Sequence, residues 1–371
     1  MIPAEKTLAD ALKKREEQGM LRKLSLLNKR IDFTSNDYLG FARSVELYKM
    51  IEDKISRSEM KVGSGGSRLL SGNSGEAEEL ELYLAKFYNS ESALLFNSGY
   101  DANVGLFSSI AKKGDTILYD ELVHASIHDG IRLSHGDSFP FRHNDLTHLE
   151  DRLNTSSGNV FVTVESVYSM DGDWVQLTDI SNLCKKHHAN LIVDEAHATG
   201  VFGKGLVLQQ KAENIVFARL HTFGKALGCH GAVVLGSPIL KEYLVNYARS
   251  FIYTTALPLH SLISIECAHQ LLEKSISIQN KLFENISYFR GKIKALNHSG
   301  WLDSHSSIQS LIVPGNNEVR TLCKILQDAD MDVRPILSPT VPKGKERIRV
   351  CLHSYNTKEE IDLLFETIEK A

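Results

Sequence analysis

The chain has 371 residues, of which 42% are hydrophobic and 24% are charged, and its formal net charge at pH 7 is −4. This length leaves room for two or three domains and a substantial core, whereas the slightly acidic balance provides no basic surface for nucleic acid. No run of eighteen apolar residues occurs, so we expect no membrane span. The five cysteines form no C-x-x-C pair, and the N-terminus lacks the apolar region of a signal peptide, which together favour a cytoplasmic protein.

The first quarter of the chain combines helical and turn-forming segments. An amphipathic pattern predicts a helix over residues 4–22. A turn-forming segment at 31–42, a glycine-rich stretch at 61–73 and a charged helix at 75–88 follow it. The glycines favour turns with positive φ, which would let that stretch pack closely against a cofactor or a partner subunit.

Short apolar runs then alternate with helical stretches. The runs cover residues 93–96, 116–119, 159–165, 190–194, 215–220 and 231–236, and the helices between several of them cover 99–112, 122–134 and 177–188. Continuous apolar runs are typical of strands buried on both faces. Their alternation with helices predicts a mostly parallel sheet with helices on each side.

The pattern changes after Pro258. A long helical region covers about 259–296, and the segments beyond it are two apolar stretches, 307–314 and 346–353, and two helices, 317–329 and 357–370. This order predicts a small α+β unit with an antiparallel sheet. We therefore expect three parts, which are an N-terminal helix and arm (1–45), a large α/β domain (46–258) and a small C-terminal α+β domain (259–371).

Polar and ionisable residues follow five of the apolar runs. They are Glu165, Ser169, Asp194, His197, His221, Thr222, Lys225, His124 and the segment 97–103. Ligands of open α/β sheets bind beyond the carboxyl ends of the strands. So many reactive groups at one edge of the sheet favour an active site over a purely structural role.

Asp194 and Lys225 indicate one kind of chemistry. A carboxylate at the end of a buried strand is costly unless it is paired, so Asp194 either caps the next turn or holds a positive charge on a ligand. Lys225 lies between Gly224 and Ala226, whose small size would leave room for a bulky group. A Schiff-base lysine and an acid that pairs with a pyridinium nitrogen are the residues that handle pyridoxal phosphate.

A phosphate group would need a cradle of backbone N–H groups. Gly99 and Tyr100 lie at a predicted helix start after a strand, where such groups and the positive end of the helix dipole gather. Ser98 or Asn97 would serve equally well as an ordinary N-cap.

Two other signatures are rejected. Residues 194–197 spell D-E-A-H, but no G-x-x-x-x-G-K-[ST] segment accompanies them, which argues against a helicase. His124 and His128 have the i, i+4 spacing of zinc ligands but lack the glutamate of H-E-x-x-H and a third ligand. We therefore expect no metal site.

Nine motifs in order resemble one family. They are SNDYLGF, GSGGSRLLSGN, NSGYDAN, HASIHDG, TVESVYSMDGD, IVDEAHATGVFG, HTFGKALGCHGA, YTTALP and RIRV, and they extend over about residues 30–355. They resemble the α-oxoamine synthases. The resemblance implies the α/β fold of fold-type-I pyridoxal phosphate-dependent transferases, with a mostly parallel seven-stranded sheet in the large domain and a smaller C-terminal α+β domain. It also implies pyridoxal 5′-phosphate as cofactor and a homodimer with shared active sites.

The resemblance assigns roles around the cofactor ring. Lys225 would hold the cofactor covalently and act as the base, Asp194 would pair with the ring nitrogen, and His124 would stack on the ring. His197 and Ser169 would lie near the phenolic oxygen. Because a lysine with a pKa of about 10.4 is a poor base at neutral pH, burial should lower the pKa of Lys225.

The resemblance also assigns residues to the phosphate. Gly99, Tyr100 and Thr222 would surround it. Thr255 or its neighbour Thr254 would reach the phosphate of the neighbouring subunit's cofactor.

Three residues would bind substrate. Arg349 would hold the amino acid's carboxylate, Asn36 would lie close to the substrate, and Arg22 would line the entrance. Members of this family often carry threonines after the equivalent arginine, whereas this chain has Cys351 and His353 there.

Within the family, the motifs SNDYLG, GSGGSRLLSGN and SVYSMDGD favour the branch that makes an amino ketone for biotin from L-alanine and a pimeloyl thioester, carried by CoA or by an acyl carrier protein. One alternative is another α-oxoamine synthase, for example one that joins glycine to acetyl-CoA. A second is a non-catalytic homologue that serves as a partner subunit. The presence of Lys225, Asp194 and His124 together argues against the second alternative.

Overall fold

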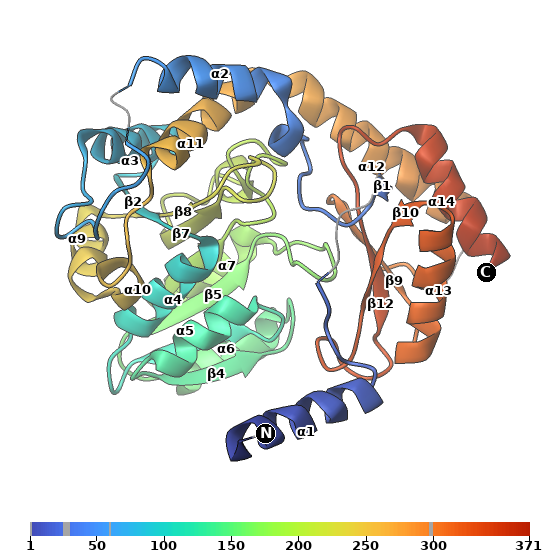
Figure 1. The fold of residues 1–371 in the computed structure, drawn as a ribbon. Helices are drawn as coiled ribbons and strands as arrows, with labels where there is room; N and C mark the ends of the chain where they lie inside the picture. The colour runs from blue at the N-terminus through green and yellow to red at the C-terminus, as the bar shows by residue number, and fades with distance from the viewer. Residues whose placement is uncertain (1, 25–29, 59–60, 297–299) are drawn as a thin grey trace.

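A seven-stranded sheet forms the centre of the computed structural model, which describes residues 2–24, 30–58, 61–296 and 300–371 (Figure 1). Its order is β2-β8-β7-β6-β5-β3-β4. The strands are β2 (Ser92–Phe96), β3 (Thr116–Asp120), β4 (Asp137–Phe141), β5 (Val160–Glu165), β6 (Asn190–Asp194), β7 (Val216–Thr222) and β8 (Ala232–Gly236). Strand β8 is antiparallel to β2 and β7 on either side of it and the other neighbouring pairs are parallel, which confirms the predicted, mostly parallel sheet.

Strand β4 was not among the six apolar runs of the sequence. Four of its five residues are exposed, and Pro140 stands within it. Proline is tolerated in a strand at the edge of a sheet, and β4 pairs there with β3 alone. A polar edge strand therefore has none of the apolar signal by which the buried strands were recognised.

Helices cover both faces of the sheet. The first face carries α4 (Gly99–Ile110), α5 (Ala125–Leu133), α9 (Pro238–Tyr247) and α10 (Arg249–Ile252), and the second carries α6 (Leu146–Thr155), α7 (Leu177–Lys186) and α8 (Leu206–Gln209). Side chains of a strand alternate between the two cores, as the pleat requires. In β6, Ile192 joins the first core, while Leu191 and Val193 join the second.

A second sheet lies in the C-terminal part of the chain. It is antiparallel, with the order β11 (Arg334–Ile336), β12 (Arg347–Cys351) and β9 (Ile308–Ile312), as the sequence predicts. The helices of this part are α12 (Ile276–Leu296), α13 (Asn316–Asp328) and α14 (Lys358–Lys370). The remaining pair, β1 (Ile31–Asp32) and β10 (Met331–Asp332), is parallel and joins the N-terminal arm to the C-terminal part.

The predicted domain limits stay a prediction. The helical region after Pro258 is two helices, α11 (Leu259–Leu272) and α12, rather than one. Helix α11, which the sequence assigned to the small domain, shares a core with α2 (Val45–Ile55) and α3 (Gly75–Phe87).

The N-terminal helix α1 (Pro3–Glu17) is shorter than the predicted 4–22. Gly19 has φ 63°, a left-handed conformation that commonly terminates helices. No residue of α1 is buried, and Figure 1 shows the helix standing apart from the body of the molecule. Within the described part of the chain, no helix has the length and apolar character required to cross a bilayer.

The buried imidazole of His269 makes the stability of this fold depend on pH. Its Nε2 lies 2.9 Å from Tyr88 Oη and its Nδ1 lies 2.7 Å from the Ile265 carbonyl oxygen. Burial lowers the pKa of His269 to about 4, although the bond to Ile265 opposes this. The unfolded chain therefore binds a proton here at a higher pH than the folded chain, and stability declines as the pH falls from about 6.5 to about 4.

We expect protonation of His269 alone to reduce the free energy of unfolding by about 2 kcal/mol when the pH falls from 7 to 5. Urea unfolding of the His269→Gln protein should show a pH dependence that is smaller by about that amount. The exposed His135, changed to Gln, is the matched control and should leave the pH dependence intact. An unchanged pH dependence in His269→Gln would contradict this account.

Candidate active site

The carboxyl ends of β5, β6 and β7 meet at one edge of the sheet. Glu165 at the end of β5 is in register with Asp194 at the end of β6, and Asp194 is in register with Leu220 of β7. Lys225 lies in the turn that follows β7. The topology thus places the two acids and the lysine at the edge where open α/β sheets bind ligands.

The carboxylate of Asp194 is held in a fixed orientation. It is 4% exposed, and its Oδ2 accepts a hydrogen bond of 2.8 Å from Asn103 Nδ2. Its Oδ1 accepts one of 2.9 Å from the Ala196 N–H. Sequence analysis missed Asn103, although its position one helical turn after Gly99 places it on the face of α4 that meets the sheet.

Lys225 has an unusual electrostatic environment. Its Nζ lies 2.8 Å from His197 Nε2. Burial lowers the pKa of Lys225 to about 8, although the negative charges of Asp194 and Glu165 oppose this. Burial and the charge of Asp194 in turn raise the pKa of Glu165 to about 8. At neutral pH this edge therefore holds a protonated Glu165 and a lysine that loses its proton easily.

The two residues beside Lys225 are small for different reasons. An added Cβ at Gly224 would have only the Cys229 carbonyl oxygen near it, at 3.6 Å, so space remains open there. Ala226 is buried and lies against Gly200. The size of Ala226 is thus explained by packing within the protein, whereas Gly224 fits the expected open space.

A chain of hydrogen bonds leads from Lys225 to Arg349. His197 Nδ1 lies 2.7 Å from Tyr38 Oη, and Tyr38 donates to Asn36 Oδ1 at 3.0 Å. Arg349 Nη2 donates to the same Asn36 oxygen at 2.9 Å and lies 3.4 Å from Tyr38 Oη. Burial and the nearby charge of Lys225 hold the pKa of His197 well below its ordinary value, so its imidazole is neutral. Tyr38 belongs to the SNDYLG motif, but no role was predicted for it.

His124 caps the N-terminus of a helix. Its Nδ1 caps α5, since it accepts a hydrogen bond of 3.2 Å from the Ser126 N–H and lies 2.7 Å from Ser126 Oγ. The side chain is nevertheless exposed. The cap fixes the ring through one nitrogen, and ring stacking on a cofactor stays a prediction.

Gly99 and Thr222 lie together at the start of α4. A Cβ at Gly99 would lie 3.2 Å from the Cβ of Thr222, which is tighter than ordinary contact. Ser98 is the N-cap and accepts from the Asp101 N–H at 3.1 Å. Tyr100 is 49% exposed, and its Oη donates to Asp129 Oδ2 at 2.6 Å. The first turn of α4 therefore has the form of an anion cradle.

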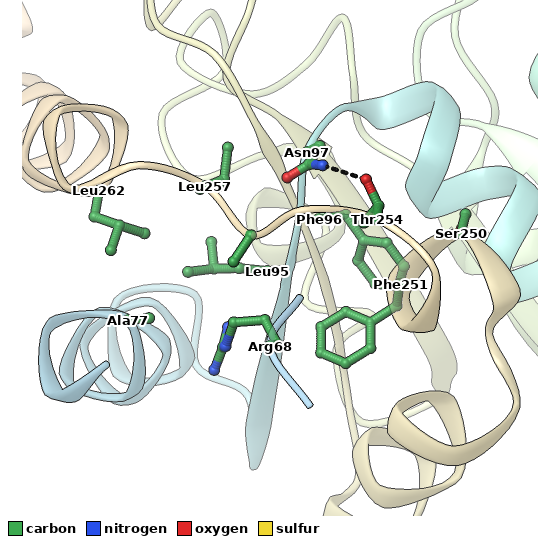
Figure 2. A pocket seen from close by; sticks show the side chains of 11 residues that line it. Arg68, Ala77, Leu95, Phe96, Asn97, Ser250, Phe251, Thr254, Leu257 and Leu262 are labelled. Atoms are coloured by element: carbon green, nitrogen blue, oxygen red, sulfur yellow. Dashed lines mark hydrogen bonds between the residues drawn. The ribbon is translucent and has the colours of Figure 1, made fainter. Parts of the chain in front are cut away.

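Thr254 and Thr255 lie beside the end of β2. Asn97 Nδ2 donates to Thr254 Oγ1 and to the Thr255 carbonyl oxygen, each at 2.9 Å. Figure 2 shows Asn97 and Thr254 above a small cavity that Arg68 borders from the glycine-rich stretch. Arg68 is held in place by Glu81, at 2.8 Å. The exposed Thr255 side chain is not brought near Lys225 by any described hydrogen bond.

Ser169 lies in a loop that an ion cluster anchors. Its side chain is buried and makes no hydrogen bond to another described residue. In the same loop, Asp173 Oδ2 lies 2.8 Å from His143 Nε2, while His143 Nδ1 lies 3.0 Å from Asp120 Oδ1. Although burial opposes protonation, the two carboxylates raise the pKa of His143 to about 10. No sequence pattern indicates this cluster, because its three members come from distant segments of the chain.

Cys351 and His353, which stand where family members often carry threonines, lie in different surroundings. Cys351 is buried, with Sγ 4.0 Å from Asn36 Oδ1, the atom that also accepts a hydrogen bond from Arg349. His353 is fully buried, its Nε2 lies 2.9 Å from the Ser35 carbonyl oxygen, and its ring stacks on Tyr355 at 4.6 Å. His353 is therefore engaged in holding the N-terminal arm.

His221 and Arg22, two of the residues singled out in the sequence, lie away from the residues around Lys225. His221 is fully buried and stacks on Tyr88 at 4.1 Å, because it points to the opposite face of β7 from Thr222. Arg22 is exposed and lines a separate cavity of about 860 Å³ beside the N-terminal arm.

The residues of this edge fit pyridoxal 5′-phosphate. An amine of lowered pKa, a fixed carboxylate and an anion cradle are present together. Two atoms, Glu165 Oε1 and Arg349 Nε, are also buried without a hydrogen-bond partner in the described chain. Such unsatisfied atoms are costly unless a ligand or water pairs with them.

Comparison with known proteins agrees with this assignment. A family model described as aminotransferase class I and II matches residues 28–368. The 8-amino-7-oxononanoate synthase of Emericella nidulans is 45% identical, over 98% of this chain and 94% of that protein. The solved 8-amino-7-oxononanoate synthase of Francisella tularensis is 31% identical with a TM-score of 0.78, over 92% of this chain and 97% of that one.

The fold is also that of a second enzyme. A serine palmitoyltransferase from S. paucimobilis, solved with bound pyridoxal phosphate, has a TM-score of 0.90 at 24% identity, over 98% of this chain and 96% of that one. The expected fold-type-I architecture is thereby confirmed. The chain belongs to the class I and II aminotransferase family and, within it, to the α-oxoamine synthases, which are pyridoxal phosphate-dependent acyltransferases.

Proposed function

We propose that the protein condenses L-alanine with a pimeloyl thioester, with loss of carbon dioxide and release of the free thiol, to give 8-amino-7-oxononanoate for biotin synthesis. The identity of 45% with an 8-amino-7-oxononanoate synthase over nearly the full length of both chains supports this substrate pair. The observation that carries the reaction type is the hydrogen-bonded chain between Lys225 and Arg349.

The amino acid would be held by its carboxylate. Arg349 has a buried Nε without a partner, and its Nη2 is oriented by Asn36. Arginine binds carboxylates through two parallel N–H groups, which fixes the orientation of the substrate as well as its position. A carboxylate anchored here would turn the Cα–H bond of the amino acid toward the amine of Lys225.

Bound pyridoxal phosphate supplies a sink for the electron pair that remains when the Cα proton is removed. By the family resemblance, Lys225 would bind its aldehyde carbon, Asp194 its ring nitrogen, and Gly99 with Thr222 its phosphate. The same resemblance places His124 on the ring face and His197 with Ser169 near the phenolic oxygen. Asp194 suits this role because its carboxylate is buried and is held in a fixed orientation by two donors.

Lys225 is suited to remove the Cα proton. With a pKa of about 8, Lys225 is the free amine in roughly a tenth of the molecules at pH 7. A base works best when its pKa lies near the working pH, since it must both accept and release the proton. The neutral His197 at 2.8 Å keeps Nζ in position without adding a charge.

We also infer that the protein acts as a homodimer in which the partner subunit completes each site. The glycine-rich stretch 61–73, whose Gly66 carbonyl oxygen accepts from the Ala256 N–H at 2.9 Å, leaves apolar side chains exposed, among them Val62 at 96% and Leu70 at 85%. A partner that covered this surface would bring the segment of Thr255 against its own cofactor site. A cytoplasmic location is part of the same proposal, because scattered cysteines fit a reducing compartment.

A substrate panel tests the proposed reaction. The purified protein with pyridoxal phosphate is mixed with L-alanine, glycine or L-serine and with pimeloyl, acetyl or palmitoyl thioesters, and products are identified by mass. We expect L-alanine with the pimeloyl thioester to react best. Lys225→Ala should lower the rate by roughly a thousandfold or more, whereas the exposed Lys185→Ala is the matched control and should not.

Each other outcome has a distinct meaning. A preference for glycine with the acetyl thioester, or for serine with the palmitoyl thioester, would replace the substrates while retaining an α-oxoamine synthase. Failure of every pair would favour the non-catalytic partner subunit.

The pKa of Lys225 is testable without turnover. In the cofactor-free protein, the rate of reductive methylation at this residue should rise with pH and reach half its maximum near pH 8. Because the charge of Asp194 stabilises the ammonium form, Asp194→Asn should lower that midpoint by about one pH unit. The exposed Asp151→Asn is the control. A midpoint near pH 10 in the unmodified protein would refute the proposed base.

Tyr38 should act as a positioning residue. Tyr38→Phe keeps the ring but leaves His197 Nδ1 buried without its partner, and we expect kcat/KM for L-alanine to fall by about tenfold. Cofactor affinity, followed by absorbance near 420 nm, should stay within about twofold, because Tyr38 acts through His197 and Asn36. Tyr48→Phe, which changes an exposed tyrosine, serves for comparison. An unaltered kcat/KM would exclude the positioning role.

A further inference from the structure

The loop 168–173, which follows β5, is closed at its base. The Tyr168 N–H donates to the Asp173 carbonyl oxygen, and the Gly172 N–H donates to the Tyr168 carbonyl oxygen, each at 2.9 Å. The Asp173 carboxylate contacts His143 of the ion cluster described above, and the ring of His143 packs edge-on against that of Tyr168 at 4.4 Å. Since the cluster includes the last residue of β3, the base of the loop is fixed to the large sheet.

The tip of the same loop contacts the small antiparallel sheet. Ser310 Oγ of β9 donates to the Met170 carbonyl oxygen at 2.6 Å. The Asp171 carboxylate forms an ion pair with Arg347 of β12. Gly172 has φ 77°, and an added Cβ there would collide with a backbone carbonyl oxygen of β9. Three consecutive residues thus meet the small sheet, so the loop joins the two sheets.

Arg347 and Arg349 lie on the same face of β12, because side chains two residues apart in a strand point to the same side. Ile348 and Val350, which alternate with them, are fully buried in the core. Arg347 contacts the loop, whereas Arg349 contacts Asn36 of the N-terminal arm. One strand thus presents one arginine to the loop and the next to the proposed site of the substrate carboxylate.

The ion pair of Arg347 with Asp171 is shielded from water. The side chain of Arg347 is 5% exposed and that of Asp171 is 24% exposed. Arg347 Nε also donates to the Lys345 carbonyl oxygen at 3.0 Å, which fixes the plane of the guanidinium group. Removing one partner of such a pair leaves a buried charge without its counter-ion, which is costly. The pair therefore opposes any displacement of β12 relative to the loop.

We propose that Arg347 and Asp171 are positioning residues for the amino-acid substrate, because their ion pair holds β12 where Arg349 can bind the substrate carboxylate. This inference rests on the proposed function, which assigns that carboxylate to Arg349. The loop that the pair holds also carries Ser169, whose buried side chain makes no hydrogen bond to another described residue. One ion pair thus positions two groups of the site, one on each side of the junction between the sheets.

Binding of the amino acid to the protein loaded with pyridoxal phosphate tests this role. L-Alanine is titrated while the cofactor absorbance near 420 nm is followed, and the variants are Asp171→Asn, Arg347→Gln and the two combined. We expect each single variant to bind L-alanine roughly tenfold more weakly or worse. The double variant should bind no more weakly than the weaker single variant, because the two residues act as one unit. Arg347→Lys, which keeps the charge, should bind within about threefold of the intact protein.

A substrate without a carboxylate separates positioning from general damage. L-Alanine methyl ester cannot form an ion pair with Arg349, so the intact protein and all variants should bind it equally. In turnover, KM for L-alanine should rise roughly tenfold, while kcat and KM for the pimeloyl thioester stay within about twofold. Asp328→Asn is the matched control, because the ion pair of Asp328 with Lys324 lies within helix α13. Equal cofactor absorbance verifies that each variant is folded.

Two results would overturn the proposal. The first is that Asp171→Asn and Arg347→Gln bind L-alanine as the intact protein does. The second is that they lose affinity for L-alanine and for its methyl ester to the same extent, because the defect is then structural. Failure of the intact protein to bind L-alanine counts instead against the proposed function, and the comparison is then made with glycine or L-serine, which carry the same carboxylate. The two proposals can therefore fail separately.

Discussion

The structure depends on a charge balance around Lys225. Burial by itself would favour the neutral amine, and the carboxylate of Asp194 by itself would favour the ammonium ion. The two effects leave the pKa near 8, where either form is accessible at physiological pH. The roles proposed for Lys225, which are to bind an aldehyde, release it and move a proton, need both forms. The arrangement of strands that places Asp194 at the end of β6 is therefore a condition of the chemistry.

Glu165 also affects the charge balance around Lys225. It is in register with Asp194, and two carboxylates so close cannot both ionise without a large cost. Burial and the charge of Asp194 raise the pKa of Glu165 to about 8, so Glu165 keeps its proton at neutral pH, while Asn103 and the Ala196 N–H donate to the carboxylate of Asp194. Were both acids charged, Lys225 would be held as an ammonium ion and lost as a base. The neutral acid thus protects the reactivity of the lysine.

The sequence predicted the elements of the fold better than the contacts between them. Buried strands such as β6 were recognised because their apolar runs are continuous, and the polar edge strand β4 was missed for lack of that signal. Asp194 and Lys225 were found because each follows such a run. Tyr38 was not assigned a role, because its contact with His197 joins residues 159 positions apart. Nor does spacing along the chain reveal that Asn36 meets Arg349, 313 residues away.

Those distant contacts explain why the N-terminal arm belongs to the site. Ile31 pairs with Met331, and the Cys351 N–H donates to the Phe33 carbonyl oxygen at 2.8 Å. Asp32 is held ionised there, since His353 and hydrogen bonds from the following residues lower its pKa although burial opposes this.

The arm is thus tied to the small antiparallel sheet, whereas Lys225 and His197 follow strands of the large one. Tyr38 and Asn36 stand between them and contact both sides, His197 on one and Arg349 on the other. A shift of the small sheet would therefore change the position of Arg349 and the orientation of His197 together. The proposed carboxylate anchor and the proposed base are coupled by one short segment, which is a mechanical reason for its dense hydrogen bonding.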